Sequence, residues 1–229
     1  MRVYGQYCPV ALGSEILGDR WTPLILREMI IGSTRFNDIE RGLPGISRTL
    51  LTQRLRHLQR SGVVEIRPMA TGRGHEYHLT EAGADLEQVL MALGDWTVRW
   101  KLAEPTEEQA DPVTLTWWMR RRLDPDHLPT RRVVVEFRYG TGPTKVVWLV
   151  LDPREHNVCQ THPGFDSDVI VLTDALSFQR VFSGLTTLAD ARRDGRVTLE
   201  GPPALVRDFP NWFLWSPFAP TVRRHLEAG

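Results

Sequence analysis

The stretch Ser47-Arg-Thr-Leu-Leu-Thr-Gln-Arg-Leu-Arg-His-Leu-Gln-Arg-Ser61 decides the fold of the N-terminal half. At about 100° per residue, Leu51, Leu55 and Leu58 share one side of a helix, with Leu50 at its edge. Serine at position 47 is typical of a helix N-cap, and Gly62 is typical of a helix end. The stretch therefore predicts an amphipathic helix over 47–61 whose leucines face a core.

The other side of this helix carries cationic and hydrogen-bonding side chains and no acid. They are Arg48, Thr49, Thr52, Gln53, Arg56 and Arg60. Arginine and glutamine can read base edges, while threonine and arginine hold phosphates. The net charge of the chain is zero, which alone argues against a nucleic-acid binder. However, residues 47–73 contain six arginines (48, 54, 56, 60, 67 and 73) and one acid, Glu65, which predicts a local basic patch.

The neighbouring segments predict a winged helix-turn-helix domain. Helices are expected over 8–17 and 21–31, a short helix over 34–40, and a turn over 42–46 before the helix 47–61. Strand patterns over 63–67 and 75–79 flank a loop, 68–74, in which Arg73 lies between two glycines. This loop is interpreted as a wing whose arginine suits the minor groove or an adjacent phosphate. A long helix follows from Thr80, and its wide apolar surface suggests a subunit interface.

Six short motifs resemble the HxlR family of MarR-like bacterial regulators. They are Gly18-Asp-Arg-Trp-Thr22, Arg35-Phe-Asn-Asp-Ile39, Gly45-Ile-Ser47, Leu51-Thr-Gln-Arg-Leu55, Glu76-Tyr-His-Leu-Thr80 and Gly83. The resemblance covers about residues 7 to 100. It implies a homodimer on an inverted-repeat operator in double-stranded DNA, with recognition helices about 34 Å, or a multiple of that, apart. With the polar side of the helix 47–61 and the wing loop, the expected DNA-binding residues are Arg35, Ser47, Arg48, Thr49, Thr52, Gln53, Arg56, Arg60 and Arg73. The wing, Met69-Ala-Thr-Gly-Arg-Gly74, departs from the tyrosine and prolines usual in the family.

Cys8 occupies the position at which this family often carries a cysteine that senses oxidants or electrophiles. A helix N-terminus favours the thiolate form, which supports a redox-sensing role. The alternative is that Cys8 is a small apolar residue in a dimer core.

The acidic, proline-bounded segment 104–112 predicts a linker between two domains. The expected organisation is a DNA-binding and dimerisation domain over 1–102, a linker over 103–112 and a second domain over 113–229. The fold class is α+β, with a mainly antiparallel sheet in the second domain.

In the second domain a helix over 114–123 precedes four strand patterns. Strands over 132–139 and 145–151 flank a hairpin signal at 140–143, and those over 157–161 and 168–173 are expected to continue the meander. Helices over 174–184 and 188–193, a strand over 196–201 and a helix over 203–212 complete the order.

The second domain resembles the sterol carrier protein type-two fold over about 130–215. That resemblance implies an apolar tunnel for lipids or acyl chains, and hence an apolar small-molecule effector. The lining candidates are Trp148, Phe178, Val181, Phe182, Phe209, Trp212, Phe213 and Trp215. The alternative is that these side chains form an ordinary core.

Several functional classes are not indicated by the sequence. No apolar run is long enough to span a bilayer, and residues 1–6 lack the features of a secretory signal, so a cytoplasmic location is expected. Two cysteines make no disulfide framework. His156, Cys159 and His162 would alternate faces on a strand, which disfavours a metal site, and no catalytic dyad or cofactor motif is present.

The sequence thus predicts a non-enzymatic, DNA-binding transcriptional regulator that responds to an apolar ligand or to oxidants. Two alternatives remain open. One is a lipid- or acyl-handling protein, and the other is a protein-interaction module, with the winged helix serving dimerisation only in each.

Overall fold

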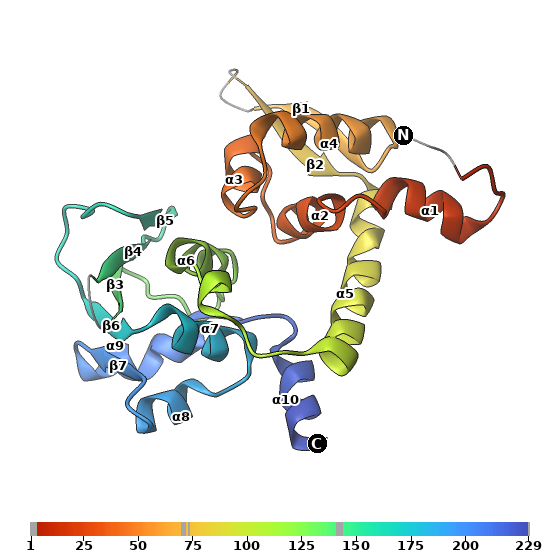
Figure 1. The fold of residues 1–229 in the computed structure, drawn as a ribbon. Coiled ribbons are helices and arrows are strands. Elements are labelled where there is room, and N and C mark those ends of the chain that lie inside the picture. The colour runs from red at the N-terminus through yellow and green to blue at the C-terminus, as the bar shows by residue number, and fades with distance from the viewer. Residues whose placement is uncertain (1–3, 70–71, 73, 141–143, 229) are drawn as a thin grey trace. The chain divides into compact units, whose positions relative to one another are not determined.

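The computed structural model describes residues 4–69, 72, 74–140 and 144–228 and has the expected α+β character (Figure 1). The chain divides into two compact units, residues 1–94 and 95–229. The long helix α5 (Glu81–Lys101) contributes residues to both units.

The first unit contains the predicted winged helix-turn-helix elements. They are α1 (Pro9–Leu17), α2 (Thr22–Ile30), α3 (Phe36–Arg41), α4 (Arg48–Arg60), β1 (Val64–Pro68) and β2 (His75–Leu79). The core of the unit includes Ile25 and Leu26 of α2 and Ile39 of α3. Leu51, Leu55 and Leu58 of α4 pack with them, and all of these side chains are nearly inaccessible to solvent. β1 and β2 pair antiparallel from Val64↔Leu79 to Pro68↔His75, so the wing is a hairpin.

The second unit contains a five-stranded sheet packed against helices. Its elements are η1 (Glu107–Gln109), α6 (Pro112–Arg121), β3 (Val133–Tyr139), β4 (Lys145–Leu151), β5 (His156–Cys159), β6 (Val169–Thr173), α7 (Ala175–Ser183), α8 (Leu188–Arg193), β7 (Val197–Glu200), α9 (Pro203–Asp208), η2 (Phe209–Trp212) and α10 (Ala219–Ala228). Alternate strand residues, such as Val135 and Phe137 of β3 and Leu149 of β4, are buried with apolar side chains of α6 and α7.

The strand order β5-β4-β3-β6-β7 corrects the expected meander. β5 does continue it, because it pairs antiparallel with β4. β6 does not, because it crosses over and pairs parallel with β3, from Val135↔Val169 to Tyr139↔Thr173. Either β5 or β3 could offer β6 an outer edge. No residue of β5 is fully buried, whereas most residues of β3 are, so the apolar segment Val-Ile-Val-Leu-Thr pairs with the buried strand β3. The sheet remains mainly antiparallel, because the other strand pairs described here run antiparallel.

The C-terminal helical prediction is wrong in detail. The expected helix over 203–212 is divided into α9 and the 3-10 turn η2. Pro210, which has no backbone N–H to donate, lies at the division. The final helix α10 was not predicted. Among the described residues, no helix is both long and apolar enough to cross a membrane.

Candidate nucleic-acid interface

The orientation of α4 follows from its cap and its leucines. The Leu50 amide donates to Ser47 Oγ at 3.2 Å, which confirms Ser47 as the N-cap. Leu51, Leu55 and Leu58 are at most 1% exposed, while Leu50 is half-buried at the edge. Gly62 follows the helix with a φ of +72°, a conformation that glycine adopts without steric cost. The polar side of α4 is therefore directed away from the core of its unit.

Four side chains on this polar side are exposed and have no acidic partner. Thr49, Gln53, Arg56 and Arg60 are exposed, and neither arginine forms an ion pair within the part of the chain that the structure describes. Thr52 is half-buried, and its hydroxyl donates to the Arg48 carbonyl at 2.8 Å. The two unpaired guanidinium groups are free to meet an anion.

Other arginines of the predicted basic patch are paired with acids. Arg48 pairs with Glu40, donates to Asn37 Oδ1 at 3.1 Å and lies 4.7 Å from the centre of the Phe36 ring, so α3 orients it. Arg54 pairs with Asp19, and Arg67 pairs with Glu65. Glu40 and Asp19 lie outside residues 47–73, so a charge count limited to that segment overstates its free positive charge.

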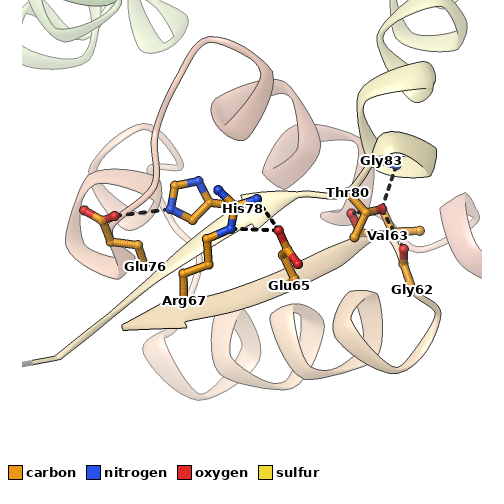
Figure 2. A network of polar contacts seen from close by, with 8 residues as sticks. All are labelled: Gly62, Val63, Glu65, Arg67, Glu76, His78, Thr80 and Gly83. Carbon is orange, nitrogen blue, oxygen red and sulfur yellow. Dashed lines mark hydrogen bonds and ion pairs between the residues drawn. The ribbon is translucent and has the colours of Figure 1, made fainter. Parts of the chain in front are cut away.

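The base of the wing is tied to the start of α5 by backbone and hydroxyl contacts (Figure 2). The Thr80 hydroxyl donates to the Gly62 carbonyl at 2.7 Å, and the Gly83 amide donates back to the Thr80 hydroxyl at 3.2 Å. The Thr80 amide donates to the Val63 carbonyl at 3.1 Å. These contacts fix the direction in which the hairpin leaves α4.

Charged side chains line the strands of the wing. Arg67 Nε donates to Glu65 Oε1 at 2.8 Å on β1, and His78 Nε2 lies 3.2 Å from Glu76 Oε2 on β2 (Figure 2). Arg35, at the N-cap of α3, lies 3.8 Å from Glu76 and keeps 58% of its side chain exposed. Arg35 is therefore placed beside the wing. Arg73, predicted at the wing tip, lies outside the described residues.

A helix-turn-helix family model and several bacterial relatives match this part of the chain. The model, described as HxlR-like helix-turn-helix, matches residues 16–105. YvaP of Bacillus subtilis, named as an uncharacterized HTH-type transcriptional regulator, is 38% identical over 88 residues, which are 38% of this chain and 81% of that relative. The chain belongs to the HxlR-like helix-turn-helix family. It is thus a transcriptional regulator, as the sequence predicted.

Two other relatives and one solved structure resemble the chain to different extents. YdeP of Bacillus subtilis is 36% identical over 96 residues, which are 41% of this chain and 74% of that relative. A regulator of Mycobacterium tuberculosis is 45% identical over 83 residues, and the match spans about half (52%) of that relative. The reduced form of the transcriptional regulator YodB from Bacillus subtilis is 31% identical, with a TM-score of 0.38 over 42% of this chain and 96% of that chain.

Most of the effector candidates in the C-terminal unit of this HxlR-family chain belong to its core. Phe178, Val181, Phe182, Phe209, Trp212 and Phe213 are buried in one apolar cluster, and Trp215 packs against it. Val181 and Trp215 also line a pocket of about 280 Å³. Trp148 lies elsewhere, half-buried on β4, with its ring centre 5.6 Å from that of His162. The structure therefore brings together seven of the eight predicted residues, and two of them face a pocket.

The histidine and cysteine candidates lie on or near β5 and at the start of α1. His156 and Cys159 lie at the two ends of β5, and His162 follows the strand. Within the described ranges, no group of three or more metal-binding side chains comes together. Burial, assisted by the charge of Arg120 and opposed by Asp152, lowers the pKa of His156 below its ordinary value. Cys8 is a free, half-buried thiol at the N-cap of α1.

Proposed function

We propose that this regulator lays α4 in the major groove of an inverted-repeat operator. The observation that carries the proposal is the acid-free, solvent-facing side of α4, on which Arg56 and Arg60 have no acidic partner among the described residues. Long, planar guanidinium groups form two parallel hydrogen bonds with guanine edges or with phosphate oxygens. Thr49 and Gln53, exposed on the same side, supply further contacts to bases and phosphates.

The remaining members of the proposed contact set are Arg35, Ser47, Arg48, Thr52 and Arg73. Arg48 exchanges its partner Glu40 for DNA, so its net contribution is smaller than that of Arg56. The hydroxyl groups of Ser47 and Thr52 are engaged with the backbone of α4, so they contact phosphates with their remaining hydrogen-bonding capacity.

The salt dependence of DNA binding tests this proposal. Each neutralised phosphate releases counterions, so the Arg56→Ala variant is expected to bind more weakly and to lower the slope of log affinity against log salt by about 1. Arg54→Ala is the matched control, because Arg54 lies on the same helix but pairs with Asp19. Fluorescence anisotropy with a labelled operator measures both variants. Unchanged affinity in a folded Arg56→Ala protein contradicts the assignment.

We also propose that the regulator is a homodimer that uses α5 and α1. Val89, Leu93, Trp96 and Trp100 recur along α5 at spacings of four, three and four residues, and each is about half exposed or more. Such spacing forms a helical stripe of the kind that packs against a second helix. α1 contains no fully buried residue, and its Val10 is 76% exposed. A second copy of the chain would cover both surfaces.

Analytical ultracentrifugation of Trp96→Glu tests the dimer. A carboxylate in the middle of the stripe would be desolvated in the dimer, so the variant is expected to sediment as a monomer. Asp85→Glu, on the same helix, is the control and leaves the assembly unchanged. A dimer that survives Trp96→Glu removes α5 from the interface.

We propose that the C-terminal unit is a sterol carrier-like domain that binds an apolar effector. The mainly antiparallel sheet, its layer of helices and the aromatic cluster around Phe209 support this proposal. The effector would act as a population shift, by favouring one spacing of the two recognition helices. Mass spectrometry of small molecules co-purified with the full chain tests it, and a domain that carries and binds no apolar compound contradicts it.

We propose in addition that Cys8 senses oxidants. Its position at the start of α1, half-buried and without a disulfide partner, supports this role. Treatment with hydrogen peroxide is expected to change operator affinity in the wild type and in the control Cys159→Ser, but not in Cys8→Ser. An equal response of Cys8→Ser refutes the role.

A further inference from the structure

A pocket of about 280 Å³ lies in the C-terminal unit, where α7, the start of α8, η2 and α10 meet. Much of its lining is apolar and comes from Val181, Leu188, Pro210, Trp215 and Ala219. Drug-sized ligands occupy pockets of about 300–1,000 Å³, so this volume suits a smaller molecule.

The wall between α7 and α10 is closely packed. Gly184 ends α7 with a φ of +86°, and a Cβ added there would lie 2.7 Å from the Cα and Cβ atoms of Ala219, the first residue of α10. The Ser216 amide donates to the Phe182 carbonyl at 3.1 Å and holds the intervening segment against α7. This wall of the pocket is therefore fixed by close packing and a backbone hydrogen bond.

Trp215 faces this pocket in an unusual backbone conformation. Its φ of +51° is the only positive value among the described non-glycine residues. Arg122 Nε donates to the Trp215 carbonyl at 2.8 Å, and the Trp215 indole donates to the Pro210 carbonyl at 3.2 Å. Left-handed conformations are costly for a residue with a Cβ and persist where the surroundings determine them, often at ligand sites.

Two arginines line the same pocket without acidic partners. Arg192 of α8 and Arg223 of α10 form no ion pair within the described ranges. By contrast, the adjacent Arg193 forms an ion pair with Asp190. Other arginines of this unit that pair with carboxylates are Arg131, Arg132, Arg138, Arg180, Arg196 and Arg207. Arg223 Nε donates to the Ala219 carbonyl at 3.3 Å, but neither guanidinium group has a carboxylate partner among the described residues. Two such groups beside an apolar wall are complementary to an anion with an apolar body.

We propose that this pocket binds a small carboxylate with an apolar body, such as an aryl carboxylate. Trp215 and the aliphatic side chains contact the body, and Arg192 and Arg223 bind the carboxylate, which accepts parallel hydrogen bonds from a guanidinium group. The lining of the pocket thus defines the chemical class of the effector. Ligand binding itself is independent of the proposed function, and only the effect of the ligand on DNA binding rests on it.

A contact within the same unit connects the pocket to α5. Thr221 lies on α10 between the pocket residues Ala219 and Arg223, and its hydroxyl donates to Asp95 Oδ1 of α5 at 2.8 Å. Asp95 directly precedes Trp96 of the proposed dimer stripe. A ligand held by Arg223 therefore acts on the element that sets the spacing of the recognition helices.

Isothermal titration calorimetry of the full chain with 1-naphthoate and the uncharged 1-naphthalenemethanol tests the proposal. Naphthoate is expected to bind at least about tenfold more tightly than the alcohol, since hydrogen bonds to charged groups are worth more than neutral ones. The double variant Arg192→Ala/Arg223→Ala is expected to bind both compounds equally. The control Arg193→Ala/Arg224→Ala changes the two neighbouring arginines, which do not line the pocket, and is expected to behave as the wild type.

Three results overturn the site: no saturable naphthoate binding, equal binding of both compounds by the wild type, or unchanged naphthoate affinity in the Arg192→Ala/Arg223→Ala variant. The link to regulation is measured separately, as operator affinity with and without naphthoate. Binding without any change in operator affinity overturns that link alone. If instead the proposed role of α4 in DNA binding is wrong, the Arg56→Ala variant keeps the operator affinity of the wild type.

Discussion

Replacing Gly83 with alanine tests the junction between the wing and α5. A Cβ at this position would lie 2.1 Å from the Val63 carbonyl oxygen, whereas such atoms keep at least 3.0 Å apart, so the helix must move by about 1 Å. Alanine gains about 1 kcal/mol over glycine in a helix interior, but overpacking costs about 1–3 kcal/mol. The hydrogen bond from the Thr80 amide to the Val63 carbonyl adds about 1 kcal/mol if it is lost. We expect a net loss of about 1–3 kcal/mol in the free energy of unfolding.

Urea denaturation followed by circular dichroism measures this loss. With a slope of about 1–3 kcal/mol per molar urea, the midpoint is expected to fall by about 1 M. Gly13→Ala is the matched control, because Gly13 also lies in a helix but has no atom within 4 Å of its Cβ position. This control is expected to be as stable as the wild type, or up to about 1 kcal/mol more stable. A Gly83→Ala protein that gains stability like Gly13→Ala would refute the close approach of α5 to Val63.

Three further predictions concern a cap, an ion pair and a histidine. Ser47→Ala removes the acceptor of the Leu50 amide and is expected to cost about 1 kcal/mol in urea denaturation; an unchanged midpoint would show that the cap is unimportant. Arg54→Ala leaves Asp19 without its partner, so a thermal melt should show a lower midpoint, and an equal melt would contradict a structural role. Folding lowers the pKa of His156, so below about pH 6.5 the unfolded chain binds a proton at this residue that the folded chain does not. The free energy of unfolding is therefore expected to fall as the pH decreases below about 6.5. Melts from about pH 5 to 8 should show a smaller fall in His156→Gln, and identical profiles would exclude this residue as a cause.

The helix α4 and its two sides were predictable from local information. Periodic leucines, a serine cap and a terminal glycine all act within one helix, and each was found as expected in α4. The pairing of its arginines was not predictable in this way. Glu40 and Asp19 approach Arg48 and Arg54 only in the folded unit, so a local sum of charges could not include them.

The second unit shows what strand patterns leave undecided. Apolar alternation predicted the strands, but it does not say which strand β6 pairs with. The crossover follows from the greater burial of β3 than of β5 in the folded sheet. The pocket was missed because its walls come from segments far apart in the chain. Val181 and Trp215 are predicted as ligand-binding residues because they are apolar. Arg192 and Arg223 carry no sequence signal that separates them from the neighbouring arginines. The positive φ of Trp215 is the structural signal that singles out this site.

Selection of random duplexes with the purified full chain at about 0.15 M salt tests the central claim most directly. The account predicts enrichment of an inverted repeat with half-sites one or more helical turns apart, and loss of that enrichment in the double variant Gln53→Ala/Arg56→Ala while Arg54→Ala still enriches it. Failure to enrich any double-stranded sequence, or equal enrichment by the Gln53→Ala/Arg56→Ala protein, would contradict the role of α4.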